Sequence, residues 1–255
     1  MTPTMFSQSQ VEEFQGNGFI IERGLAGGEL CEHMLDIIMR SVDPPLAPLE
    51  FETDVQYPGS PQDRLSPGGD TPRRLLHAYT RNKVFRNWAT GEAVTSRVRQ
   101  LMGSDQIAVS QNHHNCVMTK HPGYSSATLW HQDIRYWLFD RPELISVWLA
   151  LGDENPDNGG MLLIPGTHRD RLDRGRFDGA QFLRQDLAEN QALIDSAVSA
   201  ELSRGDVLFF HCRTLHAAGR NNTDKIKTSV VFTYHAQDNQ PLAGTRSAAY
   251  PDIVC

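Results

Sequence analysis

Residues 144–168 read LISVWLALGDENPDNGGMLLIPGTH, and this stretch decides the fold class. It opens with a short apolar run of β type, 144–151. The next segment, 155–160, gathers Asn, Pro, Asp and Gly, the residues that favour turns. A second short apolar run, 161–164, leads into another turn at 165–168. The pattern predicts two short strands joined and bounded by turns.

The same texture extends through the C-terminal half of the chain, whereas helical spacing dominates before it. A mainly β protein with α-helices is therefore expected, a jelly-roll or cupin-like barrel with an N-terminal helical layer. We expect one domain over 1–255, with a helical layer and lid loop over about 1–104 and a β core over about 105–240. The expected strands are 18–21, 106–118, 134–139, 144–151, 161–164, 207–210 and 226–234, the expected helices are 7–15, 29–39, 82–89 and 92–102, segment 178–194 is weakly helical, and 43–72 is expected to be a functional or mobile loop.

Composition narrows the classes of protein. The 255 residues include 24 Lys+Arg and 31 Asp+Glu, a net charge of −7, with 39% hydrophobic and 22% charged residues. These values are typical of a soluble globular chain and argue against general binding of nucleic acid or anionic membranes. No apolar run reaches the roughly 20 residues of a membrane span. The first 14 residues lack signal-peptide features, and four scattered cysteines fit a reducing compartment, so a cytoplasmic protein is expected.

Ten histidines are candidates for chemistry, although most histidines in proteins have only structural roles. His113 and His114 are adjacent, and on a strand they would face opposite sides and could not share a site. His211 and His235 are possible pocket residues. Structural roles are expected for His33, His77 and His121.

In the sequence His131-Gln132-Asp133, a carboxylate follows a histidine two positions later. Residues i and i+2 of a strand share a face, so His131 and Asp133 would present an imidazole and a carboxylate together. His216, in a later β segment, can supply a third ligand. Two His and one carboxylate leave three adjacent coordination positions open, the arrangement of non-haem Fe(II) oxygenases. These three residues are the predicted metal ligands and catalytic centre.

Five blocks of sequence follow one another in a fixed order: FQGNGFIIERGL at 14–25, WHQD at 130–133, VWLAL at 147–151, NGGMLLIPGTH at 158–168 and HAAGRN at 216–221. Together they resemble the phytanoyl-CoA dioxygenase family of Fe(II)- and 2-oxoglutarate-dependent oxygenases. The resemblance covers nearly the whole chain and implies a double-stranded β-helix, with Fe(II) as the metal, 2-oxoglutarate as cosubstrate, and O2 and a small molecule as partners.

The resemblance also implies an anchor for the distal carboxylate of 2-oxoglutarate, and here the chain departs from the pattern. The family usually has Arg eleven residues after the last His ligand, where this chain has Lys227. Lysine keeps the charge but lacks the planar fork of arginine. Ser229 would share its face of the strand and could add a hydroxyl. The alternative is that Lys227 is solvated and that Arg220, Arg213 or no residue is the anchor.

Four more positions match residues that the resemblance links to the cosubstrate. Trp148 and Cys116 would lie on strands beside it, and Gln132 stands between two predicted metal ligands. Arg74 precedes the helical pair and has Arg73 as its neighbour. A core aromatic role for Trp148 is the alternative.

The activity that the resemblance implies is hydroxylation of an aliphatic C–H of a small molecule, with release of succinate and CO2. Asp133 argues against a halogenase, which has a small residue at that position so that chloride can bind iron. A desaturase, an epimerase or a ring-forming oxidase would share every motif. A non-catalytic jelly-roll binding protein is the alternative from another class. Substrate and oligomeric state are not determined by these patterns.

Overall fold

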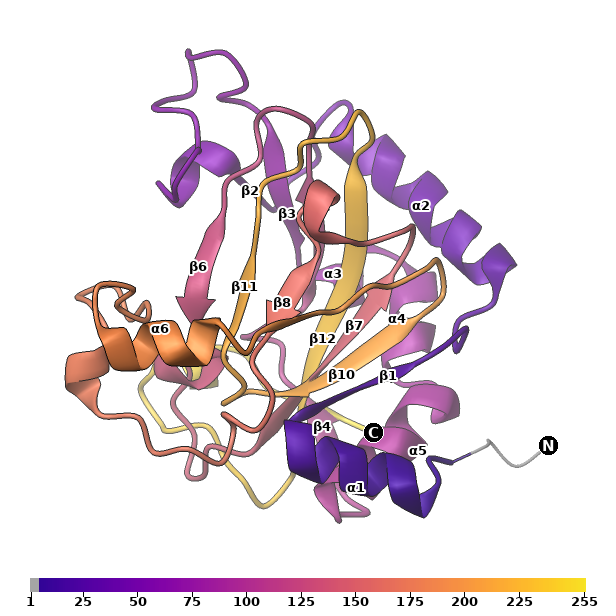
Figure 1. Cartoon of the computed structure of the whole chain (residues 1–255). Coiled ribbons are helices and arrows are strands. Elements are labelled where there is room, and N and C mark those ends of the chain that lie inside the picture. The colour runs from indigo at the N-terminus through magenta and orange to yellow at the C-terminus, as the bar shows by residue number, and fades with distance from the viewer. Residues whose placement is uncertain (1–4) are drawn as a thin grey trace.

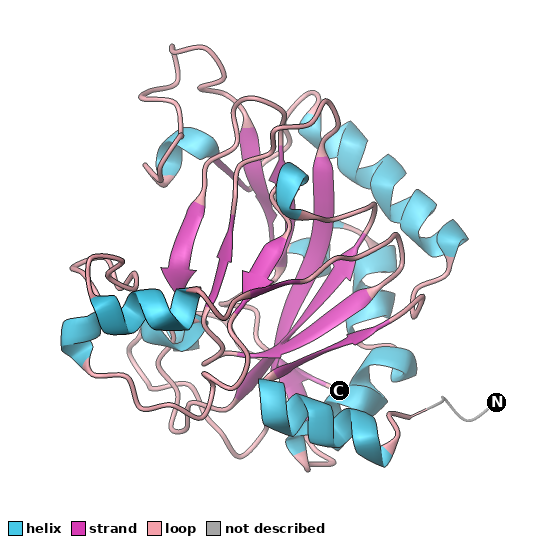
Figure 2. Ribbon diagram, viewed as in Figure 1, coloured by secondary structure: helices cyan, strands magenta, loops and turns pink. Residues whose placement is uncertain are grey.

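The computed structural model describes residues 5–255 and is built from two antiparallel sheets that face each other (Figures 1 and 2). Strand β7 (Leu144–Ala150) is buried along its whole length, and this is why the side chains on both of its faces are mainly apolar. Val147 and Leu149 belong to a cluster with the helices, whereas Trp148 and Ala150 belong to a cluster between the sheets. A strand covered on both sides reads as a continuous apolar run.

The larger sheet has nine strands and the smaller has four, which together make the expected double-stranded β-helix, or jelly roll. The fold class is confirmed. The larger sheet runs β1 (Phe19–Glu22), β10 (Val207–His211), β7, β12 (Lys227–Ala236), β5 (Cys116–Lys120), β3 (Pro72–Leu76) and β2 (Leu49–Phe51), with β4 (Ile107–Val109) pairing β12 and β13 (Ile253–Val254); the smaller runs β6 (Thr128–His131), β11 (His216–Ala218), β8 (Met161–Leu163) and β9 (Val198–Ser199).

Helices cover the outer face of the larger sheet (Figure 2). Helix α2 carries Met34 and Ile38 on its buried side, one turn apart, as the apolar spacing predicts. Ser7 caps α1 with a capping box, and Gly18 ends it in the left-handed conformation. The helices on this face are α1 (Gln8–Asn17), α2 (Gly28–Val42), α3 (Ala78–Arg81), α4 (Lys83–Ala89) and α5 (Glu92–Met102), whereas α6 (Ala188–Ile194) packs against the smaller sheet.

Two of the expected strands are wrong. The run 106–118 is two strands, β4 and β5, separated by a bend in which His114 has a positive φ of 30°. Residues 134–139 are not a strand, because a 3₁₀ turn begins at Asp133. Their apolar side chains, including Trp137 and Phe139, instead pack in a small cluster with Leu144. Burial without a ladder explains why these residues resemble a strand.

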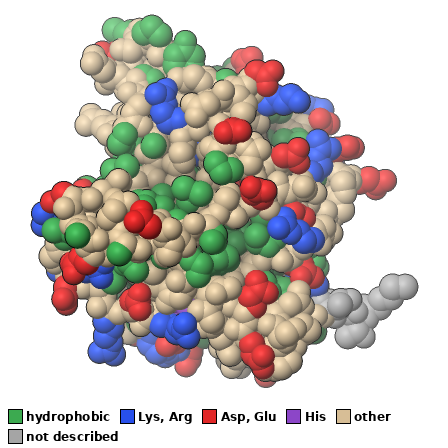
Figure 3. All heavy atoms as spheres, in the orientation of Figure 1, with side chains coloured by type: hydrophobic (Ala, Val, Ile, Leu, Met, Phe, Trp, Pro, Cys, Tyr) green, Lys and Arg blue, Asp and Glu red, His purple; other side chains and the backbone are tan. Residues whose placement is uncertain are grey.

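The N-terminal hundred residues contribute more than a helical layer. Strands β1, β2 and β3 from this part join the larger sheet, and β2 lies inside the segment expected to be a loop. No helix within 5–255 is both long and apolar enough to cross a bilayer. On the face in Figure 3, apolar side chains gather across the middle and most charged side chains surround them.

Candidate active site

The three predicted metal ligands meet in one place. His216 of β11 lies directly opposite His131 of β6 in the smaller sheet. Strand β6 ends at His131, but Gln132 keeps an extended backbone, so Asp133 still falls on the same side. Asp133 Oδ1 lies 3.5 Å from His131 Nε2 and 3.7 Å from His216 Nε2. The potential ligand atoms of all three residues lie within 4.8 Å of one another.

Backbone carbonyls orient both imidazole rings. His131 Nδ1 lies 2.8 Å from the carbonyl oxygen of Leu129, and His216 Nδ1 lies 3.0 Å from that of Thr214. Each Nδ1 therefore carries the proton and donates it, which leaves the lone pair of each Nε2 facing Asp133. Burial lowers the pKa of His216 to about 4, so its ring is neutral at physiological pH.

Asp133 completes a set of donors that fits Fe(II). Burial alone would raise the pKa of its carboxyl, but the nearby imidazoles of His114, His216 and His131 hold this pKa below its usual range. Its Oδ2 is buried without a hydrogen-bond partner among the described residues, and His114 Nδ1 lies 3.6 Å away. Two imidazoles and a carboxylate are the ligands that such iron sites use. Their role as ligands here stays a prediction.

An outer cavity of about 400 Å³ opens beside these residues and includes His131 and Asp133 in its wall. Arg74 and Cys116 also line it, as would suit residues near a cosubstrate, although contact with it stays a prediction. Arg74 approaches Glu50 at 3.4 Å. The rest of the wall is mainly aromatic and polar: Tyr57, His77, Asn112, His113, His114, Tyr136, Trp137, Arg246 and Tyr250 are among its members.

The expectation that His113 and His114 could not share a site is wrong. The bend between β4 and β5 replaces a strand here, so both side chains line the outer cavity. His113 stacks on Trp137, and burial lowers its pKa to about 3. The two other candidates lie elsewhere: His211 contacts His168, and His235 pairs with Asp252.

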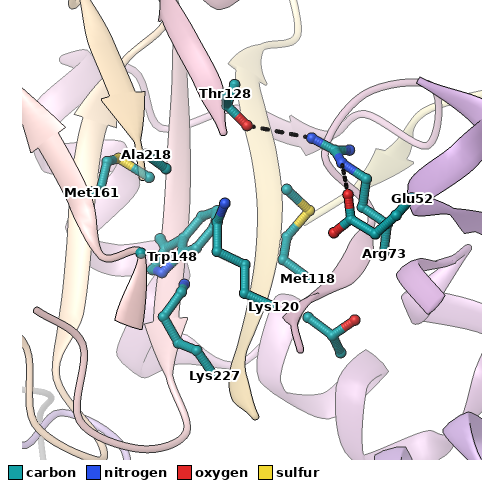
Figure 4. Close-up of a pocket in the computed structure, with 11 residues that line it drawn as sticks. Glu52, Arg73, Met118, Lys120, Thr128, Trp148, Met161, Ala218 and Lys227 are labelled. Atoms are coloured by element: carbon teal, nitrogen blue, oxygen red, sulfur yellow. Dashed lines mark hydrogen bonds and ion pairs between the residues drawn. The ribbon is translucent and has the colours of Figure 1, made fainter. Parts of the chain in front are cut away.

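A second, inner cavity of about 40 Å³ lies between the two sheets (Figure 4). Lys227 and Trp148 both line it, and the amine of Lys227 lies 5.0 Å from the centre of a Trp148 ring. Met118, Met161 and Ala218 supply apolar walls. A buried lysine in an apolar space is a suitable place for a carboxylate.

The structure adds a carboxylate at this point that the sequence patterns did not single out. Glu154 is 1% exposed and accepts a hydrogen bond from Lys227 Nζ at 3.0 Å and one from Ser229 Oγ at 2.6 Å. Trp148 Nε1 donates to the same carboxylate at 3.1 Å. The expected Lys-x-Ser pair is therefore able to bind a carboxylate, and it binds one from the chain itself.

Gln132 and the two alternative anchors lie away from both cavities. Gln132 donates to the backbone carbonyl of Arg213 and accepts from Arg135, because neighbouring residues of an extended segment point to opposite sides. Arg213 itself binds the carbonyl of Asp170. Arg220 binds carbonyls in the turn at 123–125.

Two facing sheets with a His-Asp-His cluster between them define the jelly-roll class of non-haem iron oxygenases. The family model of phytanoyl-CoA dioxygenase (PhyH) matches residues 14–229. Ectoine dioxygenase of Halomonas elongata is 25% identical, over 94% of this chain and 74% of its own length. The chain therefore belongs to the phytanoyl-CoA dioxygenase family, and it is a 2-oxoglutarate-dependent non-haem iron dioxygenase.

Solved structures agree in fold. EctD from S. alaskensis with 2-oxoglutarate and 5-hydroxyectoine has a TM-score of 0.77 at 17% identity, covering 93% of this chain and 78% of that one. The epimerase SnoN in complex with Fe3+, alpha ketoglutarate and nogalamycin RO has a TM-score of 0.72 at 19% identity, covering 93% and 90%.

Proposed function

We propose that this protein hydroxylates an aliphatic C–H of a small molecule, with release of succinate and CO2. The observation that carries the proposal is the cluster of His131, Asp133 and His216, of which the first two line a cavity of about 400 Å³. This volume lies within the usual range of small-molecule sites, roughly 300–1,000 Å³. The similarity to ectoine dioxygenase supports hydroxylation as the reaction.

Residues at the outer cavity would bind the metal and the substrate. His131, Asp133 and His216 would hold iron through two Nε2 atoms and Oδ1. When bound, Fe(II) would provide the site at which O2 oxidises both 2-oxoglutarate and the substrate. The substrate would occupy the outer cavity beside the ring of Trp137, and Arg74 would contact the cosubstrate from the same wall. His113 and His114 are neutral there, since burial lowers their pKa values to about 3 and about 4.

The distal carboxylate of 2-oxoglutarate would enter the inner cavity. Lys227 and Ser229 are the proposed anchors, because their side chains already bind a carboxylate oxygen in the structure. Trp148 would cover the carbon chain with its ring and Cys116 would line the path to the metal. We propose no role in cosubstrate binding for Gln132, whose amide is occupied by the backbone. A cytoplasmic location stays a prediction.

A substrate screen scored by succinate formation tests this proposal. We expect purified protein with Fe(II) to convert 2-oxoglutarate faster when a true substrate is present. Mass spectrometry of the product, with isotopically labelled O2, then separates the reactions. Gain of a labelled oxygen supports hydroxylation, loss of a hydrogen pair indicates a desaturase or ring-forming oxidase, and an unchanged mass indicates an epimerase. Absence of succinate with every candidate, together with tight substrate binding, would indicate a non-catalytic binding protein.

A further inference from the structure

The charges around the inner cavity do not balance through Lys227 alone. Glu154 already matches Lys227, with their side chains 0% and 3% exposed. A cosubstrate carboxylate would be the second buried anion beside this one lysine. Burying an unmatched charge is costly, so a second cation is required.

Lys120 is placed to provide it. On the neighbouring strand β5, Lys120 lies directly opposite Lys227 in the register of the larger sheet, and both side chains line the inner cavity. Both extend toward Trp148 (Figure 4). Like charges directly opposite each other in a sheet are normally destabilising, so their placement in a buried space indicates a site for an anion.

Lys120 is also free of any carboxylate partner in the described chain. Its Nζ donates to two backbone carbonyls, Ser126 at 2.7 Å and Gly219 at 2.6 Å, which leaves one N–H. Arg73, the other cation of this cavity, pairs with Glu50 at 2.7 Å and lies 3.8 Å from Glu52, a buried carboxylate in the same wall. Of the three cations, Lys120 alone lacks such an ion pair within residues 5–255.

The turn chemistry of the sequence supports the position of this lysine. Gly159, with φ of 77°, lies so close that a Cβ there would be 2.6 Å from Lys120 Cδ and 2.6 Å from the carbonyl oxygen of Gly219. Only glycine fits this position. The Asn-Gly-Gly turn therefore lets the lysine stem pass close to the backbone at the wall of the cavity.

We infer that Lys120 is a second anchor for the distal carboxylate of the cosubstrate, beside a Lys227 whose charge Glu154 already matches. The inference rests on the proposed function. Arg73 and Arg74 lie against the carboxylates of Glu50 and Glu52 and offset these two charges. The two lysines are then left with two carboxylates, one from Glu154 and one from 2-oxoglutarate, and the buried charges balance when the cosubstrate is bound.

Calorimetric titration of 2-oxoglutarate into anaerobic Fe(II)-loaded protein tests the inference without turnover. Lys120→Gln keeps N–H donors for the two carbonyls but removes the charge. We expect its Kd for 2-oxoglutarate to rise about 10- to 100-fold, the range of a charge-assisted hydrogen bond. The matched ligand is 2-oxopentanoate, which lacks the distal carboxylate, and its Kd should be the same for both proteins. An equal rise in Kd for both ligands would overturn the inference, because Lys120 would then only stabilise the fold.

A second variant distinguishes a binding role of Lys120 from a purely structural one. Glu154→Gln removes the internal carboxylate and frees the charge of Lys227. We expect this variant to bind 2-oxoglutarate at least as tightly as the natural protein, and the double variant Lys120→Gln/Glu154→Gln to recover most of the lost affinity. Loss without recovery in the double variant would contradict the inference. If the natural protein itself bound no 2-oxoglutarate, the proposed function would fail instead.

Titration of Lys120 gives a further readout. Burial, and then the charges of Lys227 and Arg73, lower the pKa of Lys120 to about 7, while Glu52 and Glu154 act in the opposite direction. The amine is charged below this pKa and neutral above it. The Kd for 2-oxoglutarate should therefore rise as pH increases through 7 in the natural protein. This dependence should be much weaker in Lys120→Gln, and an unchanged pH profile would count against the anchor.

Discussion

Replacing His131, Asp133 or His216 by alanine should abolish iron binding at micromolar metal and with it all succinate formation. Each change removes one of three ligand atoms that lie within 4.8 Å of one another. The loss is expected to exceed that of any other single substitution, because within residues 5–255 these three form the one cluster of potential metal ligands. Anaerobic titration with Fe(II), followed by metal analysis of the desalted protein, measures the binding.

A neighbouring histidine provides the matched control. His113→Ala also removes an imidazole from the wall of the outer cavity, but this ring hydrogen-bonds Ser247 and stacks on Trp137. It should leave one Fe(II) per chain. If His216→Ala kept near-normal iron affinity while folded, the third ligand would have to be another residue and the proposed site would be wrong.

Lys227→Ala should have the second largest effect, and it should act on stability as well as on the cosubstrate. Removing one partner of a buried pair leaves Glu154 charged and unmatched, which costs about 3–5 kcal/mol of unfolding free energy. The 2-oxoglutarate requirement should also rise by one to two orders of magnitude, from loss of a charge-assisted contact of about 1.5–3 kcal/mol. Urea unfolding and 2-oxoglutarate titration at saturating iron measure the two effects.

The double variant Lys227→Ala/Glu154→Gln separates these effects. It should regain most of the stability, because no unmatched charge is left, while part of the cosubstrate defect persists. Ser229→Ala should cost less, on the order of 1 kcal/mol, as expected for a neutral hydrogen bond. Lys227→Arg should keep part of the affinity for 2-oxoglutarate only if the inner cavity has room for the larger, planar guanidinium group. A stable Lys227→Ala protein with an unchanged titration would exclude Lys227 as an anchor.

The fold was predictable because its signals are local. The runs at 144–151 and 161–164 and the turns between them correspond to β7, β8 and their connection. The structure of segment 134–139 was not predictable from such signals. Its apolar side chains are buried, but they belong to a 3₁₀ turn and irregular chain rather than to a strand of a β-sheet. Apolar composition alone does not distinguish these two kinds of burial.

The candidate site was predictable to the extent that its residues form short motifs. His131 and Asp133 share a face through the extended Gln132, which the spacing indicates. Lys120 and Glu154 carry no such signal. The first is identified by strand register, since it lies opposite Lys227, and the second by the path of the chain after β7. Both depend on contacts between distant segments, which one sequence alone does not reveal.

The construction of the smaller sheet has a consequence for how the chain unfolds. Its strands have only four, three, three and two residues, so few ladder hydrogen bonds hold it. The histidines on its paired strands β6 and β11 lie 85 positions apart in the chain. A metal held by both would close this long loop and protect the native state, by about 2.7 kcal/mol when free metal is 100 times its Kd. Chelation should therefore accelerate amide exchange first at β6 and β11, while the centre of the larger sheet, β7 and β12, stays protected.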